Sequence, residues 1–298
     1  MKYSIENDFL KVTADSFGAE LMSVINKKTG EEMMWQGNPE IWDGHCPMLF
    51  PYCGKLKNNR YILDGKEYTS PKHGFIKNYD HELFSNEKDK MHFIAYSNEE
   101  TRKLFPRDFT YETIYSLKEN KLIQQVIVTN KSNKELRFGL GFHPAFNMPF
   151  NNDKSTKDYE IQFEIPQTPV VKDNFTSGPN EGLVSGKTYQ LVKNSCVIPL
   201  NDNMFDADSI CLSQLTAKTI SLVEKDTGKK ITVDIEGFPY VLLWSMGGKG
   251  SLKFLCIEPW LTVQDTGDAS GNWNNKACAA ELAPEESWHK ELNITFYR

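Results

Sequence analysis

The segment Phe254-Leu255-Cys256-Ile257-Glu258-Pro259-Trp260 has the composition of a buried β-strand that runs into a carboxylate. Side chains alternate between the two faces of a strand, so Glu258 shares its face with Phe254 and Cys256. Pro259 has no N–H group to donate to a neighbouring strand, and we therefore expect the strand to end there or to lie at a sheet edge. The segment predicts a buried sheet with an acidic side chain at the tip of one strand.

Glu258 has two interpretations. Its apolar neighbours and Trp260 would partly remove the carboxylate from water, which raises its pKa and suits it to proton transfer near neutral pH. Alternatively, it forms a structural ion pair or is solvated at the strand end. The segment alone favours the structural interpretation, so the choice depends on the other polar residues that converge on Glu258.

The rest of the chain repeats a pattern of short strands joined by tight turns. Lys28-Thr29-Gly30, Asp64-Gly65 and Asp226-Thr227-Gly228 each lie between apolar or β-branched runs, which predicts hairpins. The expected strands are Leu10–Ala14, Ala19–Ile25, Met33–Trp35, Tyr61–Leu63, Lys66–Thr69, Phe93–Tyr96, Tyr111–Leu117, Leu122–Val128, Glu135–Leu140, Ser221–Glu224, Ile231–Ile235, Tyr240–Ser245 and Leu292–Tyr297.

Helical signals are few. Asn98 is a candidate N-cap for a short helix that ends before Pro106, and Pro39–Trp42 has the pattern of a single helical turn. We therefore expect an all-β protein, a large antiparallel β-sandwich that forms one domain over residues 1–298. The size of the chain makes the sheets large, with one face open to a ligand.

Composition favours a folded protein and gives mild evidence against a polyanionic substrate. The 298 residues carry a formal net charge of -6, which gives no basic surface for nucleic acid and little attraction to an anionic membrane. The N-terminus has no apolar signal core, and no apolar run is long enough to cross a bilayer. Six scattered cysteines without C-x-x-C spacing indicate reduced thiols. We expect a cytoplasmic protein without nucleic-acid or membrane partners.

The segment from Gly139 to Asn147 places a histidine near two glycines. By strand alternation Gly139, Gly141 and His143 share one face, and the missing side chains leave space beside the imidazole. Glycine weakens a strand interior and often admits a ligand or another backbone there. The alternative is a bulge with a hydrogen-bonded core histidine.

Three polar positions elsewhere are candidates for ligand contacts. Arg60 opens a strand, where its guanidinium can fork onto paired hydroxyls or a carboxylate. His73 precedes Gly74, which lets backbone or ligand approach closely. Asp208 stands just before an apolar strand. Each has an ordinary alternative: a solvated arginine, a loop histidine bonded to a carbonyl, and a turn aspartate.

Motifs of several enzyme classes are missing from the sequence. It has no G-x-S-x-G elbow, no H-E-x-x-H, no Walker loop and no Rossmann glycine pattern. His73, His143 and a carboxylate have the chemistry of metal ligands, but no compact ligand spacing supports such a site. We predict no metal and no cofactor.

Taken in chain order, these segments resemble the aldose 1-epimerases, also called galactose mutarotase-like proteins, and most closely their bacterial LacX-like branch. The resemblance spans most of the chain and implies a β-supersandwich with a sugar in a cleft on one sheet. The matching pieces are Asn59-Arg60, His73-Gly74-Phe75, His143-Pro144-Ala145-Phe146-Asn147, Asp208 at its strand start, and Ile257-Glu258-Pro259-Trp260.

The resemblance also implies a role for five residues. Glu258 matches the general base and His143 the general acid. His73 matches a second histidine that contacts the sugar and supports the acid step. Arg60 and Asp208 match residues that hold sugar hydroxyls.

Some details differ from the family pattern or stay open. Asp206 is an alternative to Asp208, because the two are close in sequence. Better-studied relatives have His-Gly-Gly and an Asn-His-x-x-Phe-Asn type of motif, whereas here Phe75 follows Gly74 and Pro144 follows His143. We expect Phe75 to narrow the pocket and the proline to reshape the backbone beside the acid.

Aromatic residues near these motifs are candidates for stacking on the apolar face of a pyranose. They are Trp35, Trp244, Trp260 and Phe75. Core packing is the alternative for each.

The chemistry of anomer exchange agrees with these roles. A base removes the proton of the C1 hydroxyl, an acid protonates the ring oxygen, and the opened ring closes on the other face. The sequence therefore predicts an isomerase that interconverts the α and β anomers of a free hexose. We expect Glu258 and His143 to face each other across a gap the size of a pyranose.

Three alternatives stay open. One is a non-catalytic carbohydrate-binding or regulatory protein on the same fold. Another is a hexose-phosphate 1-epimerase, which needs a basic cluster at the cleft; Lys55, Lys57 and Arg60 are the nearest candidates. A glycosidase with Asp208 and Glu258 as its carboxylate pair is the third, and it requires a defined separation between the two groups.

Overall fold

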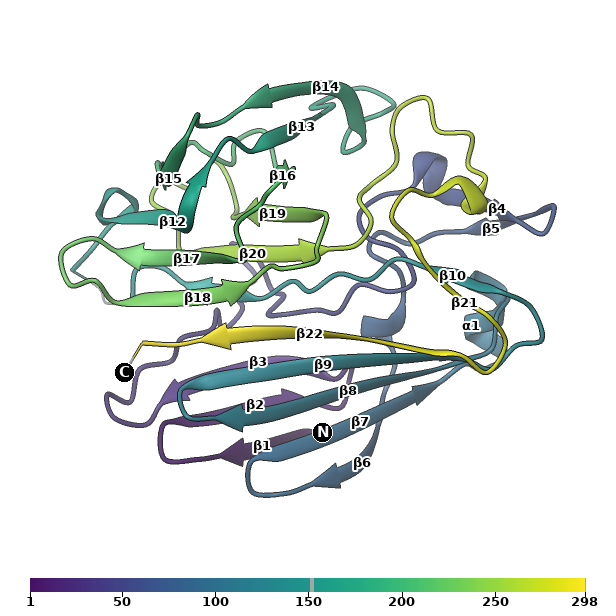
Figure 1. Ribbon diagram of the computed structural model, residues 1–298, viewed down its shortest axis with the longest axis horizontal. Coiled ribbons are helices and arrows are strands. Elements are labelled where there is room, and N and C mark those ends of the chain that lie inside the picture. The colour runs from purple at the N-terminus through teal and green to yellow at the C-terminus, as the bar shows by residue number, and fades with distance from the viewer. Residues whose placement is uncertain (151–152, 298) are drawn as a thin grey trace.

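Two large antiparallel sheets dominate the structure (Figure 1). The computed structural model describes residues 1–150 and 153–297. The nine-stranded sheet has the order β15-β12-β17-β18-β22-β9-β8-β7-β6, and the six-stranded sheet has the order β11-β20-β19-β16-β13-β14. The expected all-β class and large antiparallel sandwich are therefore confirmed.

The strands of the two sheets have the following bounds. The larger sheet contains β6 (Glu82–Asn86), β7 (Lys90–Tyr96), β8 (Phe109–Lys118), β9 (Lys121–Asn130), β12 (Tyr159–Gln167), β15 (Ser195–Pro199), β17 (Thr219–Glu224), β18 (Lys230–Asp234) and β22 (Ser287–Thr295). The smaller contains β11 (Ala145–Asn147), β13 (Val170–Asn174), β14 (Val184–Gln190), β16 (Ile210–Ser213), β19 (Tyr240–Trp244) and β20 (Phe254–Trp260).

Alternation of side chains builds the main core. In β8 and β9 every second residue is buried, as with Tyr111 and Tyr115 on β8 and Val126 and Val128 on β9. These side chains belong to one hydrophobic cluster that also takes in residues of the smaller sheet, such as Ile257. Each large apolar side chain that is fully buried contributes about 1.5–3 kcal/mol relative to exposure.

Short sheets and hairpins complete the sandwich. Asp64-Gly65 joins β4 to β5 as predicted, and Asp226-Thr227-Gly228 joins β17 to β18. The smaller units are the three-stranded sheet of β1 (Lys2–Glu6), β2 (Leu10–Asp15) and β3 (Glu20–Asn26), the hairpin of β4 (Arg60–Leu63) and β5 (Lys66–Thr69), and the pair of β10 (Leu136–Phe138) and β21 (Ala280–Leu282).

Helices are short. The Asn98 side chain accepts hydrogen bonds from the N–H groups of Glu100 and Thr101, which confirms it as the N-cap of α1 (Glu99–Leu104). No helix within the described residues has the length and apolar composition needed to span a membrane. Single 3₁₀ turns occur at Lys57–Asn59, Ile76–Asn78, Thr156–Asp158 and Trp273–Asn275.

The return strand expected at Met33–Trp35 does not form. Instead, the Glu32 carboxylate accepts hydrogen bonds from the N–H groups of Val24 and Met34, each at 2.9 Å. Met34 makes only an isolated bridge to Phe146. The prediction was wrong because the segment changes partner within three residues: the Met33 N–H donates to the Val24 carbonyl, whereas the Trp35 N–H donates to the Ala145 carbonyl, each at 2.9 Å.

β20 continues through Pro259, contrary to expectation. Pro259 is paired with Val241 of β19, and its carbonyl accepts a hydrogen bond from the N–H of Phe142 at 3.1 Å. The N–H and C=O groups of a strand residue point to the same side, so the missing donor of Pro259 faces the irregular segment around Phe142 and not β19. The strand tolerates the proline because its regular partner on that side, β11, pairs only with Phe254–Cys256.

Candidate active site

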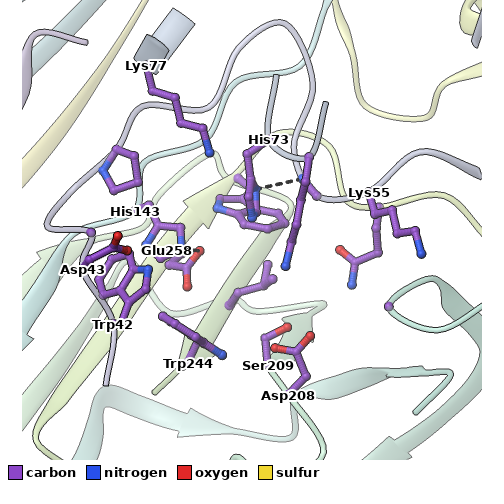
Figure 2. A pocket seen from close by; sticks show the side chains of 18 of the residues that line it. Trp42, Asp43, Lys55, His73, Lys77, His143, Asp208, Ser209, Trp244 and Glu258 are labelled. Atoms are coloured by element: carbon purple, nitrogen blue, oxygen red, sulfur yellow. Dashed lines mark hydrogen bonds and ion pairs between the residues drawn. The ribbon is translucent and has the colours of Figure 1, made fainter. Parts of the chain in front are cut away.

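A cavity of about 500 Å³ lies beside β20 and brings together four of the five predicted site residues (Figure 2). Glu258, His143, His73 and Asp208 all line it. This volume is within the range of small-molecule sites. Arg60 is not among the lining residues.

The strand register places His143 opposite Glu258. Ala145 pairs with Cys256 in an antiparallel ladder, and Gly141 forms a bridge to Trp260 in the same register. His143 lies midway between these two pairs, and so does Glu258. Their side chains are in direct contact, with Nε2 of His143 3.2 Å from Oε2 of Glu258. The expectation of a pyranose-sized gap between them was wrong, because both are carried by adjacent chain segments on the same face.

Burial sets the protonation of this pair. The Glu258 and His143 side chains are only 2% and 8% exposed. Burial raises the pKa of Glu258 well above its ordinary value; the charge of Lys72 opposes this shift and that of Asp208 adds to it. Burial likewise lowers the pKa of His143 to about 3, because loss of water disfavours the imidazolium. Both shifts favour the uncharged carboxyl and imidazole over an ion pair.

His73 is held as a neutral hydrogen-bond donor. The N–H of Gly54 donates to Nδ1 of His73 at 3.2 Å (dashed line in Figure 2), so the ring proton is on Nε2. Burial lowers the pKa of His73 well below its usual value, and neighbouring positive charges add to this effect. Its ring lies 5.8 Å from that of His143, between centroids. The partly buried His73 therefore lies beside the buried pair of His143 and Glu258.

The residues that follow His73 serve the fold. A Cβ atom on Gly74 would lie 2.0 Å from the carbonyl oxygen of Phe50, so the expected close approach is made by backbone. The side chain of Phe75 is 1% exposed and packs edge-on against the Phe50 ring in the main core. The expectation that Phe75 narrows the pocket was wrong, since it is not among the lining residues.

Tryptophan side chains form a wall beside Glu258 and His143. Trp42 stacks on His143 with centroids 5.4 Å apart, and Trp244 meets Trp42 edge-on. Of the tryptophans selected from the sequence, Trp244 and Trp260 line the cavity and Trp35 does not. Trp42 also lines the cavity but was missed. The predicted helical turn at Pro39–Trp42 is a plain turn closed by the Asn38 N–H, which donates to the Trp42 carbonyl at 2.8 Å.

The two candidate aspartates have different surroundings. Asp208 lines the cavity, on the side away from Lys77 (Figure 2). Asp206 does not; its carboxylate accepts a hydrogen bond from the N–H of Gly248 at 2.9 Å, so it holds two loops together. The structure thus favours Asp208 for contact with a ligand.

Arg60 lies outside the cavity. It is the first residue of β4, and its guanidinium pairs with Glu67 of β5 at 2.8 Å. Both side chains are about half exposed, at 52% and 53%. The solvated surface arginine, which was the alternative interpretation, describes its position here.

The space beside the two glycines is filled by the protein. A Cβ atom on Gly139 would lie 2.1 Å from Oγ1 of Thr262, and one on Gly141 would lie 2.6 Å from the Trp260 ring. These glycines therefore admit side chains of β20 and the residues that follow it, not a ligand. Their close packing fixes the register that brings His143 to Glu258.

The described residues contain one group with metal-ligating chemistry, and it differs from the combination considered from sequence. Ligand atoms of His143, Cys256 and Glu258 all lie within 4.8 Å of one another. Burial raises the pKa of both Cys256 and Glu258. Metal ligation requires the deprotonated forms, so a metal at this group would have to displace the protons of Cys256 and Glu258.

Comparisons with known proteins identify the family of the chain. The family model for aldose 1-epimerase matches residues 1–295. The plasmid and chromosomal LacX proteins of Lactococcus lactis subsp. lactis are each 28% identical over 302 residues, covering 99% of both chains. The expected resemblance to LacX-like proteins is confirmed.

Solved structures extend the match to the fold. A galactose mutarotase related enzyme from Lactobacillus acidophilus is 32% identical with a TM-score of 0.94, covering 100% of this chain and 98% of that one. A galactose mutarotase-like protein from Lactobacillus casei ATCC 334 is 28% identical with a TM-score of 0.89, covering 100% of both. The sandwich is therefore the galactose mutarotase-like supersandwich, and the chain belongs to the aldose 1-epimerase family.

Proposed function

We propose that this protein is an aldose 1-epimerase, an isomerase of carbohydrate metabolism that interconverts the α and β anomers of a free hexose by acid–base ring opening, without a cofactor. The observation that carries the proposal is the contact between Glu258 and His143 inside a cavity large enough for a sugar. The family relationship supports the reaction class.

Direct contact between acid and base suits this reaction. The C1 hydroxyl oxygen and the ring oxygen of a pyranose are both bonded to C1, so the two protons that must move are close together. A carboxylate and an imidazole 3.2 Å apart can therefore serve both oxygens of one anomeric centre. Two groups on opposite sides of the sugar are not required.

The transfers balance without any other reactant. Glu258 as carboxylate takes the proton from the C1 hydroxyl while C1=O1 forms and the C1–O5 bond breaks. His143 as imidazolium gives its proton to O5. Rotation about C1–C2 presents the other face of the aldehyde, and the same transfers in reverse close the ring. The reactive pair, carboxylate with imidazolium, has the same net charge as the neutral pair, so no proton from solvent is needed.

Other residues of the cavity hold the sugar. Nε2–H of His73 is a fixed donor toward a sugar oxygen, and Asp208 is an acceptor for hydroxyl protons. The Trp244 and Trp260 rings offer apolar surface to the C–H face of a pyranose. All of them are neutral or acceptor groups, which suits a ligand rich in hydroxyls. The six free cysteines, four of them buried, support a cytoplasmic location.

Exchange NMR tests the proposal. The rate of α to β conversion is measured for glucose, galactose and other hexoses, in a weakly catalysing buffer, with and without the protein. We expect acceleration that is proportional to protein concentration for at least one hexose. No acceleration across the panel would contradict the proposed activity.

The alternative of a non-catalytic sugar-binding protein has less support. Phe75, a departure from the family pattern beside His73, lies in the main core and does not line the cavity. Substitution Glu258→Gln separates the two: an enzyme loses turnover and keeps sugar binding, whereas a pure binder has no turnover to lose.

A further inference from the structure

The indole N–H of Trp260 is a buried donor without an acceptor. Trp260 is 2% exposed, and within residues 1–150 and 153–297 its Nε1 forms no hydrogen bond. Two other tryptophans show the usual arrangement: the equally buried Trp273 donates to the Arg137 carbonyl at 2.7 Å, and Trp35 donates to the Trp42 carbonyl at 2.9 Å. A buried N–H group without a partner is unfavourable, because it loses its bond to water and gains none.

Close packing holds the Trp260 ring in place. Trp260 ends β20 and forms a bridge to Gly141, and a Cβ atom on Gly141 would lie 2.6 Å from Cδ1 of the indole. Cδ1 is bonded to Nε1, so the polar edge of the ring lies against the chain segment that carries His143. The His73 ring meets the indole edge-on, with centroids 5.5 Å apart. The N–H group therefore belongs to the surroundings of the candidate site and not to a distant part of the core.

Glu258 is the acceptor next to this donor. Glu258 and Trp260 are two residues apart on β20, so their side chains leave the strand on the same face. Burial raises the pKa of Glu258, and the Trp260 side chain opposes this shift as a nearby donor. The two groups nevertheless do not meet in a hydrogen bond of ordinary geometry. The donor is thus beside the carboxyl group but is not engaged by it.

The other described neighbours of the ring offer no strong acceptor. They form a small cluster of two aliphatic side chains, Leu49 and Leu242, and two thiols, Cys53 and Cys211. Thiol sulfur is only a weak acceptor. Nε1 is also closed to water, so a sugar in the cavity can reach the ring of Trp260 but not this atom. The carboxyl group of Glu258 is therefore the partner that fits the donor best.

The unmade hydrogen bond gains strength when Glu258 ionises. The surroundings of Glu258 and His143 favour the uncharged forms, whereas the proposed reaction uses a carboxylate and an imidazolium. A hydrogen bond to a charged group is about twice as strong as one between neutral groups. An N–H group beside the carboxyl therefore stabilises the reactive form more than the uncharged form. Stabilisation of this kind raises kcat and has little effect on substrate affinity.

Resting on the proposed epimerase function, we propose that Trp260 is a positioning residue for the general base, and that its Nε1–H donates to the Glu258 carboxylate whenever the base is charged. This donor acts through Glu258 and does not touch the reacting atoms. The face of the same ring remains available to the sugar, so the two parts of one side chain have separate roles.

Removal of the N–H group alone tests this inference. Benzothienylalanine in place of Trp260, introduced by suppression of a stop codon, keeps the shape of the side chain and replaces the N–H group by sulfur. We expect kcat for the hexose that the wild type exchanges fastest to fall by about tenfold or more, as for a lost hydrogen bond to a charged group, with KM within about twofold of wild type. An unchanged kcat, or a rise in KM alone, would overturn the inference.

Trp273→Phe is the matched control. It removes an indole N–H that has an acceptor and lies outside the cavity. The melting temperature should fall, because the Arg137 carbonyl loses its donor, whereas kcat and KM per folded molecule should stay at the wild-type values. Circular dichroism gives the folded fraction of each variant. If Trp273→Phe lowered kcat as much as the change at Trp260, loss of any buried indole would explain the result and the inference would fail.

The NMR signal of the indole proton tests the inference without turnover. Absence of the signal in Trp260→Phe assigns it. As pH is raised above 7 and Glu258 ionises, the signal should move downfield in the wild type and stay in place in Glu258→Gln. A signal that does not move in the wild type, or that moves equally in Glu258→Gln, overturns the role of Trp260. A shift that depends on Glu258 in a protein that exchanges no hexose would contradict the proposed function alone.

The other ionisable groups near Glu258 are the same in the wild type and in Glu258→Gln. Besides the two thiols of the small cluster, they are Lys72, Asp208, His143, His73, Cys46 and Cys256. Burial lowers the pKa of both histidines, so neither titrates above pH 7. A shift of the indole signal that is lost in Glu258→Gln therefore reports the charge of Glu258.

Discussion

The two faces of β20 are equally buried and differ in what they bury. Leu255 and Ile257 point into the main hydrophobic core, whereas Cys256 and Glu258 point toward the cavity side. All four side chains are at most 2% exposed. Burial alone therefore does not tell a core residue from a candidate site residue on this strand. The two kinds of residue differ in whether the buried side chain is apolar or ionisable.

The two faces have opposite effects on stability. Apolar side chains on the core face stabilise the fold because their surface is removed from water. Glu258 on the other face raises the free energy of the folded state whenever it is charged, since its hydration is lost. We infer that the core face holds the strand rigid so that the opposite face can keep an unfavourable carboxylate against His143.

The largest expected effect comes from removing the carboxylate on the cavity face. Glu258→Gln should lower the rate of anomer exchange by about 10²–10⁴-fold, the usual contribution of a positioned acid or base. Thermal unfolding at pH 8 should not occur at a lower temperature than in the wild type, because the amide has no charge to desolvate. Exchange NMR measures the rate of anomer exchange, and a melting curve measures the unfolding temperature.

Glu224 provides the matched control for that substitution. It is also fully buried, but it lies in the larger sheet, where its carboxylate accepts hydrogen bonds from Tyr159 and Thr227. Glu224→Gln should lower the melting temperature and leave exchange per folded molecule unchanged. If it reduced exchange as much as Glu258→Gln, burial of a glutamate, and not its place in the cavity, would explain the result.

Truncation of a side chain on the core face should lower stability and leave the rate of anomer exchange nearly unchanged. Ile257→Ala should reduce the free energy of unfolding by about 2–5 kcal/mol through lost apolar burial and a cavity. Exchange by the folded fraction should stay within a few-fold of wild type, because the side chain points away from Glu258. Urea unfolding and exchange NMR below the melting transition check this; a collapse of kcat would show that the two faces are coupled.

A smaller effect is expected at the neighbouring aspartates. Asp208→Asn should raise KM by about tenfold, since a charged acceptor for hydroxyl groups is lost. Asp206→Asn should leave KM unchanged, because that side chain bonds the Gly248 N–H outside the cavity. Steady-state kinetics on both variants compares them directly. If KM changed more in Asp206→Asn than in Asp208→Asn, Asp206 would be the residue that contacts the sugar.

The smallest expected effect is the response of exchange to acid. Burial lowers the pKa of His143 to about 3, so the pair takes up a second proton only in strong acid. From pH 7 to about pH 5 the exchange rate per folded molecule should be nearly constant, whereas an imidazole with an ordinary pKa of about 6.5 would lose activity over this range. A tenfold fall by pH 5.5 would show that His143 titrates normally.

Stability must be followed in the same experiment. A histidine whose pKa is depressed in the folded protein takes up a proton more readily when the chain is unfolded, so stability falls as pH drops below about 6.5. His73 and His143 both contribute in this direction. Rates therefore need to be divided by the folded fraction, measured by circular dichroism at each pH.

Local pattern predicted most of the fold and part of the site. Alternation along β20 gave the faces of Leu255 and Glu258 correctly, and turn residues located the hairpin at Asp64-Gly65. The contact of His143 with Glu258 was out of reach, because it depends on a register between segments more than 100 residues apart. That register is fixed by the close packing of Gly141 against Trp260.

The misses have a common cause. Arg60 matched a short motif, but its side chain meets Glu67 across a hairpin and does not reach the cavity. Trp42 lies in a turn with no periodic pattern, so nothing in its local sequence marked it as a cavity residue. Which side chains enter a cavity depends on how separate segments pack together, and local sequence carries little of that information.

A double-mutant cycle on the acid–base pair tests the central claim most directly. Anomer exchange is measured by NMR for Glu258→Gln, His143→Asn and the double variant, each confirmed as folded by circular dichroism. If the two residues act as a unit on one anomeric centre, the double variant should be no more than a few-fold slower than the slower single variant. If the two losses multiply, or if either single variant keeps the wild-type rate, the two groups do not share the reaction and the account is contradicted.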